Sequence, residues 1–192
     1  MSKLTNRFEQ ALVYASRLHQ KQTRKGGDIP YISHLLSVAA LVLEDGGDED
    51  EAIAALLHDA VEDQGGVETR EVILNMFGIR VVEIVDSCTD TDTIPKSPWK
   101  ERKSEYIKKL RHAPASVNRV TLADKLHNAR SILKDLSIYG DATWDRFSGG
   151  KSGTLWYYHT LLELFLETNP DSWLVKELNR IVNQFEITEN RE

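Results

Sequence analysis

The chain has 192 residues, of which 41% are hydrophobic and 28% are charged, and its formal net charge is −6. This length suits one domain with a single core. The acidic balance argues against a general nucleic-acid binder or membrane-surface binder, because both need a basic surface.

Apolar residues recur with helical spacing along most of the chain. In the first half, this pattern predicts helices over residues 5–21, 33–44, 49–63, 67–76 and 79–90. Gly26, Gly27 and Pro30 interrupt it in a loop before the second helix, for which Ser33 is the expected N-cap. The β-branched run at residues 81–85 leaves a short strand there as the alternative.

In the second half, the spacing predicts helices over residues 99–112, 114–136, 154–168 and 170–185. Residues 91–98 are predicted to be a loop, and the glycine-rich stretch 139–153 a flexible one. No repeat, low-complexity tract or linker divides the sequence. We therefore expect one all-α domain over residues 1–192, a helical bundle of about eight to ten helices.

We take the stretch Ala52–Asp63, AIAALLHDAVED, as the one around which the chain is organised. Its first half is apolar, and its second half places His58, Asp59, Glu62 and Asp63 on the same predicted helix. Residues four apart share a helix face, so His58 is expected near Glu62 and Asp59 near Asp63. Because unpaired charges are costly to bury, this grouping predicts a bound divalent metal.

Two further residues of metal-ligand type lie on other predicted helices, His34 and Asp124. Together with His58 and Asp59 they would form a mixed nitrogen and oxygen site, suited to manganese, iron or another octahedral ion, with two positions left open. The alternatives are a core histidine at position 34, an ion pair of Asp124 with Arg119 or Lys125, and a solvated end for the central helix.

Three segments carry a family resemblance: RKGGDIPYISH, HDAVED and LADKLHNARS. The pattern of His34, His58, Asp59 and Asp124 resembles that of the HD-domain metal-dependent phosphohydrolases. The segments are similar to the hydrolase domain of the RelA/SpoT alarmone enzymes, most of all to the small alarmone hydrolases. The resemblance covers residues 8–136, and residues 137–192 are expected to form a helical C-terminal extension.

The resemblance implies a Mn²⁺ ion held by His34, His58, Asp59 and Asp124, and it leaves another divalent metal open. It also implies that Glu62 and Asp63 position or deprotonate the attacking water. Both carboxylates are predicted one helical turn beyond two ligands, within reach of such a water. The alternative for this pair is a cap on the next loop or an ion pair with Arg24.

The implied reaction is hydrolysis of the 3′-pyrophosphate of ppGpp or pppGpp to GDP or GTP and pyrophosphate. In the family an Arg-Lys pair before PYI contacts the nucleotide, which here corresponds to Arg24 and Lys25. Asn128 and Ser131 match family positions near the ribose and base. Lys103, on the basic helix 99–112, is the expected phosphate contact on that helix. The alternative for Arg24, Lys25 and the basic helix is that their charges only form a solvated surface.

Departures from the family pattern at Leu35, Thr121 and Lys125 loosen the substrate assignment. The competing functions are therefore hydrolysis of an adenosine alarmone or NADPH, and metal-dependent nucleotide binding without turnover. We expect a small-molecule nucleotide as partner, no nucleic acid and no membrane, and leave a homo-oligomer open. The single cysteine, Cys88, permits no disulfide within the chain, and no apolar signal region is seen, so we expect a cytoplasmic protein.

Overall fold

A computed structural model describes residues 3–89 and 97–187 of the chain. These residues form α-helices, a 3₁₀ helix and an isolated bridge between Thr23 and Pro30, which confirms the predicted all-α class. Nine of the helices in the described ranges have nine or more residues. The chain divides into two compact units, residues 1–96 with 113–124 and residues 97–112 with 125–192. The single domain over residues 1–192 stays a prediction.

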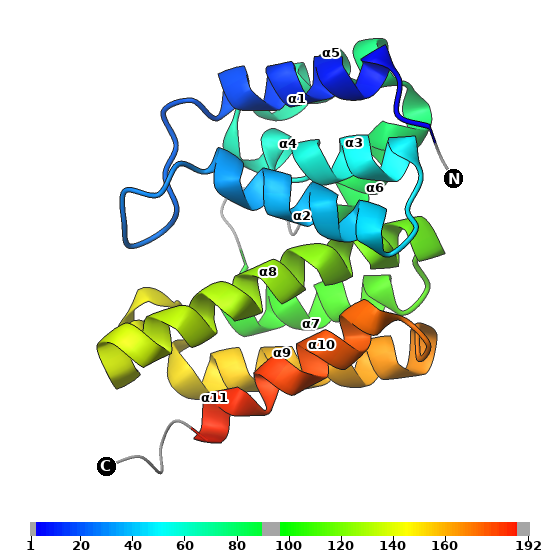
Figure 1. The fold of residues 1–192 in the computed structure, drawn as a ribbon. Coiled ribbons are helices and arrows are strands. Elements are labelled where there is room, and N and C mark those ends of the chain that lie inside the picture. The colour runs from blue at the N-terminus through cyan, green and yellow to red at the C-terminus, as the bar shows by residue number, and fades with distance from the viewer. Residues whose placement is uncertain (1–2, 90–96, 188–192) are drawn as a thin grey trace. The chain divides into compact units, whose positions relative to one another are not determined.

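The first unit is built around a buried central helix. Its elements are α1 (Asn6–Leu18), α2 (Ile32–Glu44), α3 (Glu49–Leu57), α4 (Ala60–Asp63), α5 (Gly66–Phe77), α6 (Ile79–Cys88) and the first part of α8 (Ala115–Tyr139). Figure 1 shows α3 between α1 and α2, and both helices contact it. Every side chain from Ala52 to Leu57 is fully buried. Burial of a side chain such as Ile53 or Leu56 stabilises the fold by roughly 2 kcal/mol.

The central helix begins at a capping box. The Asp48 carboxylate accepts a hydrogen bond from the Glu51 backbone at 3.0 Å, and the Glu51 carboxylate accepts one from the Asp48 backbone at 2.7 Å. The preceding turn needs glycine, since a Cβ at Gly47 would lie 2.5 Å from Cγ1 of Val42. This turn sets the close approach of α3 to α2.

The predicted helix over residues 49–63 is wrong in one respect, because it is broken at His58 and Asp59, which form a turn. Helix α3 ends at Leu57, and the short helix α4 begins at Ala60. The His58 ring donates a hydrogen bond from Nδ1 to the Ala55 carbonyl at 2.9 Å. Histidine side chains near the C-terminus of a helix can satisfy carbonyls of its last turn in this way. The break therefore falls at two adjacent residues, His58 and Asp59, that are both expected metal ligands.

The second helix also begins differently from the prediction. Helix α2 starts at Ile32, preceded by Tyr31 as N-cap without a side-chain hydrogen bond, so Ser33 lies inside the helix and is not its cap. The Ser33 and His34 amides donate to the carbonyls of Pro30 and Tyr31, at 3.1 and 2.9 Å. Residues 81–85 lie in α6, which rules out the alternative strand.

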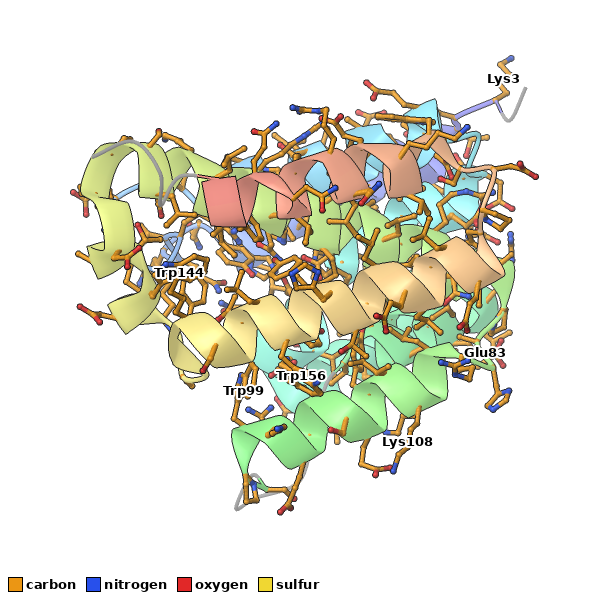
Figure 2. The ribbon with its side chains drawn as sticks, turned by 90° about the horizontal axis from the view of Figure 1, so that it is seen from below. Lys3, Glu83, Trp99, Lys108, Trp144 and Trp156 are labelled. Atoms are coloured by element: carbon orange, nitrogen blue, oxygen red, sulfur yellow. The ribbon has the colours of Figure 1, made fainter. Side chains whose placement is uncertain are left out.

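The second unit places aromatic residues between its helices. Its elements are α7 (Trp99–Leu110), the remainder of α8, the 3₁₀ helix Gly140–Arg146, α9 (Gly150–Thr168), α10 (Trp173–Val182) and α11 (Gln184–Ile187). Figure 2 shows Trp99 and Trp156 side by side, and their ring centroids are 6.2 Å apart. Tyr157 and Tyr158 are buried in this unit.

The flexible loop predicted over residues 139–153 is instead a 3₁₀ helix followed by the first turn of α9. A Cβ at Gly149 or Gly153 would lie 2.7 or 3.1 Å from the Trp99 ring. These glycines therefore make room for an indole. The predicted loop over residues 91–98 lies outside the described residues except for Ser97 and Pro98. No helix in the described ranges is long and apolar enough to cross a membrane.

Candidate metal centre

Four side chains that the sequence predicts as metal ligands converge in the first unit. His34 lies in the first turn of α2, His58 and Asp59 at the break between α3 and α4, and Asp124 on α8. Nε2 of His34 lies 3.3 Å from Oδ1 of Asp124 and 3.6 Å from Oδ2 of Asp59. Nε2 of His58 lies 3.0 Å from the same Asp59 oxygen and 3.7 Å from the same Asp124 oxygen.

The orientation of the His58 ring leaves one nitrogen for a ligand. Nδ1 donates to the Ala55 carbonyl, so the neutral ring carries its lone pair on Nε2. This Nε2 is buried, and in the neutral ring it finds no hydrogen-bond donor among the described residues. It faces carboxylate oxygens, which also carry lone pairs, and that arrangement is repulsive without a cation between them.

The pKa shifts in this cluster also indicate a site for a cation. Burial lowers the pKa of His58, but Asp59 and Asp124 outweigh it and hold that pKa well above its ordinary value. Burial raises the pKa of Asp59, but the two imidazoles outweigh it and hold that pKa well below its ordinary value. The cluster therefore favours positive charge among its four side chains, from protons or from a metal ion.

A divalent metal fits these donors. His34, His58 and Asp59 each offer a ligand atom, and these atoms lie within 4.8 Å of one another. His34 and His58 are almost fully buried, and Asp124 is 7% exposed. Two imidazoles and two carboxylates suit a borderline or hard divalent ion that keeps open positions for water and substrate oxygens.

Tyr31, which directly precedes α2, holds the Asp59 carboxylate. Its hydroxyl donates to Oδ2 of Asp59 at 2.6 Å. Burial and the negative charge of Asp59 raise the pKa of Tyr31 far above its ordinary value, so the hydroxyl keeps its proton and remains a donor. Outer hydrogen-bond partners of this kind orient metal-binding carboxylates.

Glu62 and Asp63 are both exposed on α4. The Asp63 carboxylate accepts a hydrogen bond from Nε2 of Gln22 at 2.8 Å. Partial burial raises the pKa of Asp63, the Gln22 hydrogen bond lowers it, and the charges of Asp59 and Glu62 raise it again, with a net increase. A carboxylate with a raised pKa is a better proton acceptor.

The basic loop before α2 is closed at its base. The Tyr31 amide donates to the Gln22 carbonyl at 2.9 Å, and the Arg24 amide donates to the Ile29 carbonyl at 2.8 Å. The Arg24 guanidinium carbon lies 5.5 Å from the centre of the Tyr31 ring. Arg24 is half-buried and Lys25 is exposed. The loop therefore presents its cations next to a residue that contacts the centre.

The remaining predicted substrate contacts belong to the second unit. Nζ of Lys103 lies 5.1 Å from the centre of the Tyr157 ring. Asn128 is half-buried on α8, one helical turn after Asp124, and the Ser131 hydroxyl donates to the His127 carbonyl at 3.1 Å. Their contact with substrate stays a prediction.

Sequence reasoning missed the residues that support the centre. Tyr31 lies in the motif PYISH, but only the fold brings its hydroxyl to Asp59. His19 is the C-cap of α1 and Gln22 lies in the segment that follows, where their types alone indicate solvated polar residues. His19 is 2% exposed, and this burial is the feature that sets it apart.

Comparison with known proteins extends these observations. A family model described as HD domain matches residues 11–141. The chain is 40% identical over 126 residues to a protein of Xenopus tropicalis named guanosine-3′,5′-bis(diphosphate) 3′-pyrophosphohydrolase MESH1, covering 64% of this chain and 68% of that one. It is 36% identical to the human MESH1 over the same coverage. It is also 35% identical over 177 residues to the GTP pyrophosphokinase rsh of Brucella melitensis, covering 86% of this chain but only 23% of that longer protein.

Solved structures agree with the sequence relatives. A structure described as a metazoan ortholog of SpoT that hydrolyses ppGpp superposes with a TM-score of 0.77 at 26% identity, covering 96% of this chain and 98% of that one. The Listeria monocytogenes protein lmo0812 superposes with a TM-score of 0.69 at 31% identity, covering 79% and 97%.

The helical fold and the cluster of two histidines with an aspartate define a protein of the HD class, whose phosphohydrolases depend on divalent metals. This chain belongs to the HD-domain family, and among its relatives are ppGpp 3′-pyrophosphohydrolases. The predicted family is thereby confirmed.

Proposed function

We propose that this chain hydrolyses the 3′-pyrophosphate of ppGpp and pppGpp, and that its metal is Mn²⁺. Water adds to the phosphorus that carries the ribose O3′, the P–O3′ bond breaks, and O3′ takes up a proton. The products are GDP or GTP and pyrophosphate. The observation that carries the proposal is the convergence of His34, His58, Asp59 and Asp124 beside two exposed carboxylates.

We expect the metal to be held by His34, His58 and Asp59, whose ligand atoms lie close together, and by Asp124, which lies near both histidines. Tyr31 would orient Asp59. When bound, the metal would acidify a water and polarise the phosphoryl group. Two nitrogens and two carboxylates suit manganese, iron or another octahedral divalent ion, and the family resemblance favours manganese among these.

The proton of the attacking water would pass to a carboxylate on α4. Glu62 and Asp63 follow Asp59 closely in the chain, and the raised pKa of Asp63 suits a proton acceptor at neutral pH. Glu62 is the second candidate, or it positions the same water. General-base catalysis of this kind contributes about 10²- to 10⁴-fold to a rate.

Arg24 and Lys25 would contact the nucleotide from the loop that ends at Tyr31. A planar guanidinium can stack on a purine, and its place over the Tyr31 ring supports such an arrangement. Lys103, Asn128 and Ser131 are proposed as further contacts, supported by the family positions for the latter two and by positive charge for Lys103.

The test is turnover by the manganese-loaded protein with ppGpp, pppGpp, ppApp and NADPH in separate reactions, with products identified by chromatography. GDP and pyrophosphate from ppGpp are expected, and in heavy-oxygen water the label should enter pyrophosphate rather than GDP. Protein stripped of metal by a chelator serves as the control and should be inactive until manganese is restored. Turnover of NADPH or ppApp but not of ppGpp would contradict the guanosine assignment.

A further inference from the structure

We propose that Gln22 is a positioning residue for Asp63, and that the amide of Gln22 is itself oriented by His19 and Gln64. This inference rests on the proposed function, since it assigns Asp63 to the proton transfer. It goes beyond that function because it places part of the catalytic geometry in the segment that follows α1.

The hydrogen bonds around Gln22 determine which way its amide faces. Oε1 of Gln22 lies 2.6 Å from Nδ1 of His19 and accepts a bond from Nε2 of Gln64 at 2.7 Å. An amide oxygen only accepts, so Nδ1 of His19 must donate. The opposite orientation would set the NH₂ group of Gln22 against that of Gln64 and its oxygen against a carboxylate. Nε2 of Gln22 is therefore directed at Asp63.

The residues that orient Gln22 are themselves restrained. His19 is 2% exposed, and its ring stacks on that of Tyr31 with centroids 5.4 Å apart and planes 17° apart. The Gln64 carbonyl accepts a hydrogen bond from the Thr69 hydroxyl. Gly65, at φ 120°, makes the turn between them, and a Cβ there would lie 2.7 Å from that hydroxyl oxygen. Gln22 thus has two partners with little freedom of their own.

Asp63 needs such a partner because α4 offers it little restraint. The helix has only four residues, Asp63 is its last, and the side chain is exposed. Without the 2.8 Å bond from Gln22, the carboxylate could rotate among several staggered rotamers. A displacement of about 1 Å in a reacting group can cost on the order of 10²-fold in rate.

Gln22 also closes the basic loop. Its carbonyl accepts from the Tyr31 amide at 2.9 Å, and the Tyr31 hydroxyl holds Asp59 at 2.6 Å. Gln22 and Tyr31 thus close the loop that carries Arg24 and Lys25. Their side chains bind Asp63 on α4 and Asp59 at the α3–α4 break. The backbone part of this arrangement remains when only the Gln22 side chain is changed, which separates positioning from loop formation.

The test compares Gln22→Met, which is of similar size but has no amide, and Gln22→Glu, which keeps an acceptor for His19 but offers no donor to Asp63. Gln20→Glu is the matched control, because Gln20 is exposed nearby and the charge change is the same. We would measure kcat and KM for ppGpp with manganese, thermal melting, and crystal structures of wild type and Gln22→Met.

In both Gln22 variants kcat should fall by about 10- to 100-fold with KM and melting temperature little changed, and Asp63 should leave its wild-type rotamer. Gln20→Glu should behave as wild type. The proposal is overturned if Gln22→Met keeps the wild-type kcat, or if only KM changes. It is also overturned if both variants fail to fold, or if Asp63 keeps its wild-type rotamer. If wild type does not turn over ppGpp, the proposed function fails, and the crystal structures still decide the role of Gln22.

Discussion

Nε2 of His34 lies 3.3 Å from Oδ1 of Asp124, although the two residues lie on helices α2 and α8. A separation this short between two almost fully buried side chains indicates a shared partner or a shared proton. We assign that place to a divalent metal. Asp124 is the proposed ligand that lies furthest along the chain, so it tests whether the four side chains act as one site.

Replacement Asp124→Asn should weaken manganese binding by about tenfold or more, because the loss of even an outer hydrogen-bond partner costs about 10- to 100-fold in metal affinity. Isothermal titration with Mn²⁺ measures this directly. Asp135→Asn is the control on the same helix, since Asp135 pairs with Arg146 at 2.9 Å rather than with the cluster. Equal affinity in Asp124→Asn and wild type would exclude Asp124 as a ligand.

Replacement Tyr31→Phe removes the hydrogen bond to Asp59 and keeps the ring that contacts His19 and Arg24. Manganese affinity should fall by about tenfold, because Asp59 loses the group that orients it. The KM for ppGpp should change little, since the face over which Arg24 lies is retained. A variant with wild-type metal affinity but weakened substrate binding would instead assign the Tyr31 hydroxyl to the nucleotide.

Replacements Glu62→Gln and Asp63→Asn, made separately, should identify the proton acceptor. The variant that loses the base should have a kcat lower by about 10²-fold or more, while manganese binding remains. The other variant should lose less. The two variants are compared by their single-turnover rates at saturating manganese. Unchanged turnover in both would show that neither Glu62 nor Asp63 takes part in the mechanism.

Arg119 joins helix α8 to the turn before α3 and should matter for stability. It contacts Asp45 at 3.1 Å and the almost fully buried Glu51 at 2.5 Å. Arg119→Ala leaves the Glu51 charge without its cation and should lower the free energy of unfolding by about 3 kcal/mol. Urea unfolding followed by circular dichroism measures this value.

The control for that measurement is Arg130→Ala, because Arg130 pairs with Glu177 at 3.2 Å on the protein surface. An exposed pair of this kind contributes less than about 1 kcal/mol. Similar losses in both variants would show that burial of Glu51 does not set the cost.

Much of the fold could be predicted because apolar periodicity is a local signal. The buried run from Ala52 to Leu57 marked the central helix, and α6 followed its pattern. The break at His58 could not be predicted, because the apolar pattern does not show that the His58 ring bonds to the Ala55 carbonyl there. The first turn of α9 looked like a flexible loop because the sequence does not reveal that Trp99 occupies the space beside Gly149 and Gly153.

The candidate site could be predicted as a set of ligand types, and the structure brings His34, His58, Asp59 and Asp124 together. The residues that support it could not be predicted. Tyr31 and Asp59 are 28 positions apart, and Gln22 and Asp63 are 41 positions apart. Their hydrogen bonds form only when the fold brings the basic loop next to α4 and the α3–α4 break. Residue spacing along the chain does not predict that contact.

The most direct test of a metal held by these four side chains is a crystal structure of the manganese-loaded protein, with anomalous diffraction at the manganese absorption edge. We expect one strong anomalous peak coordinated by Nε2 of His34, Nε2 of His58 and carboxylate oxygens of Asp59 and Asp124. A peak held by other residues, or full ppGpp hydrolysis by crystals and solutions without any ion at these four side chains, would contradict this assignment.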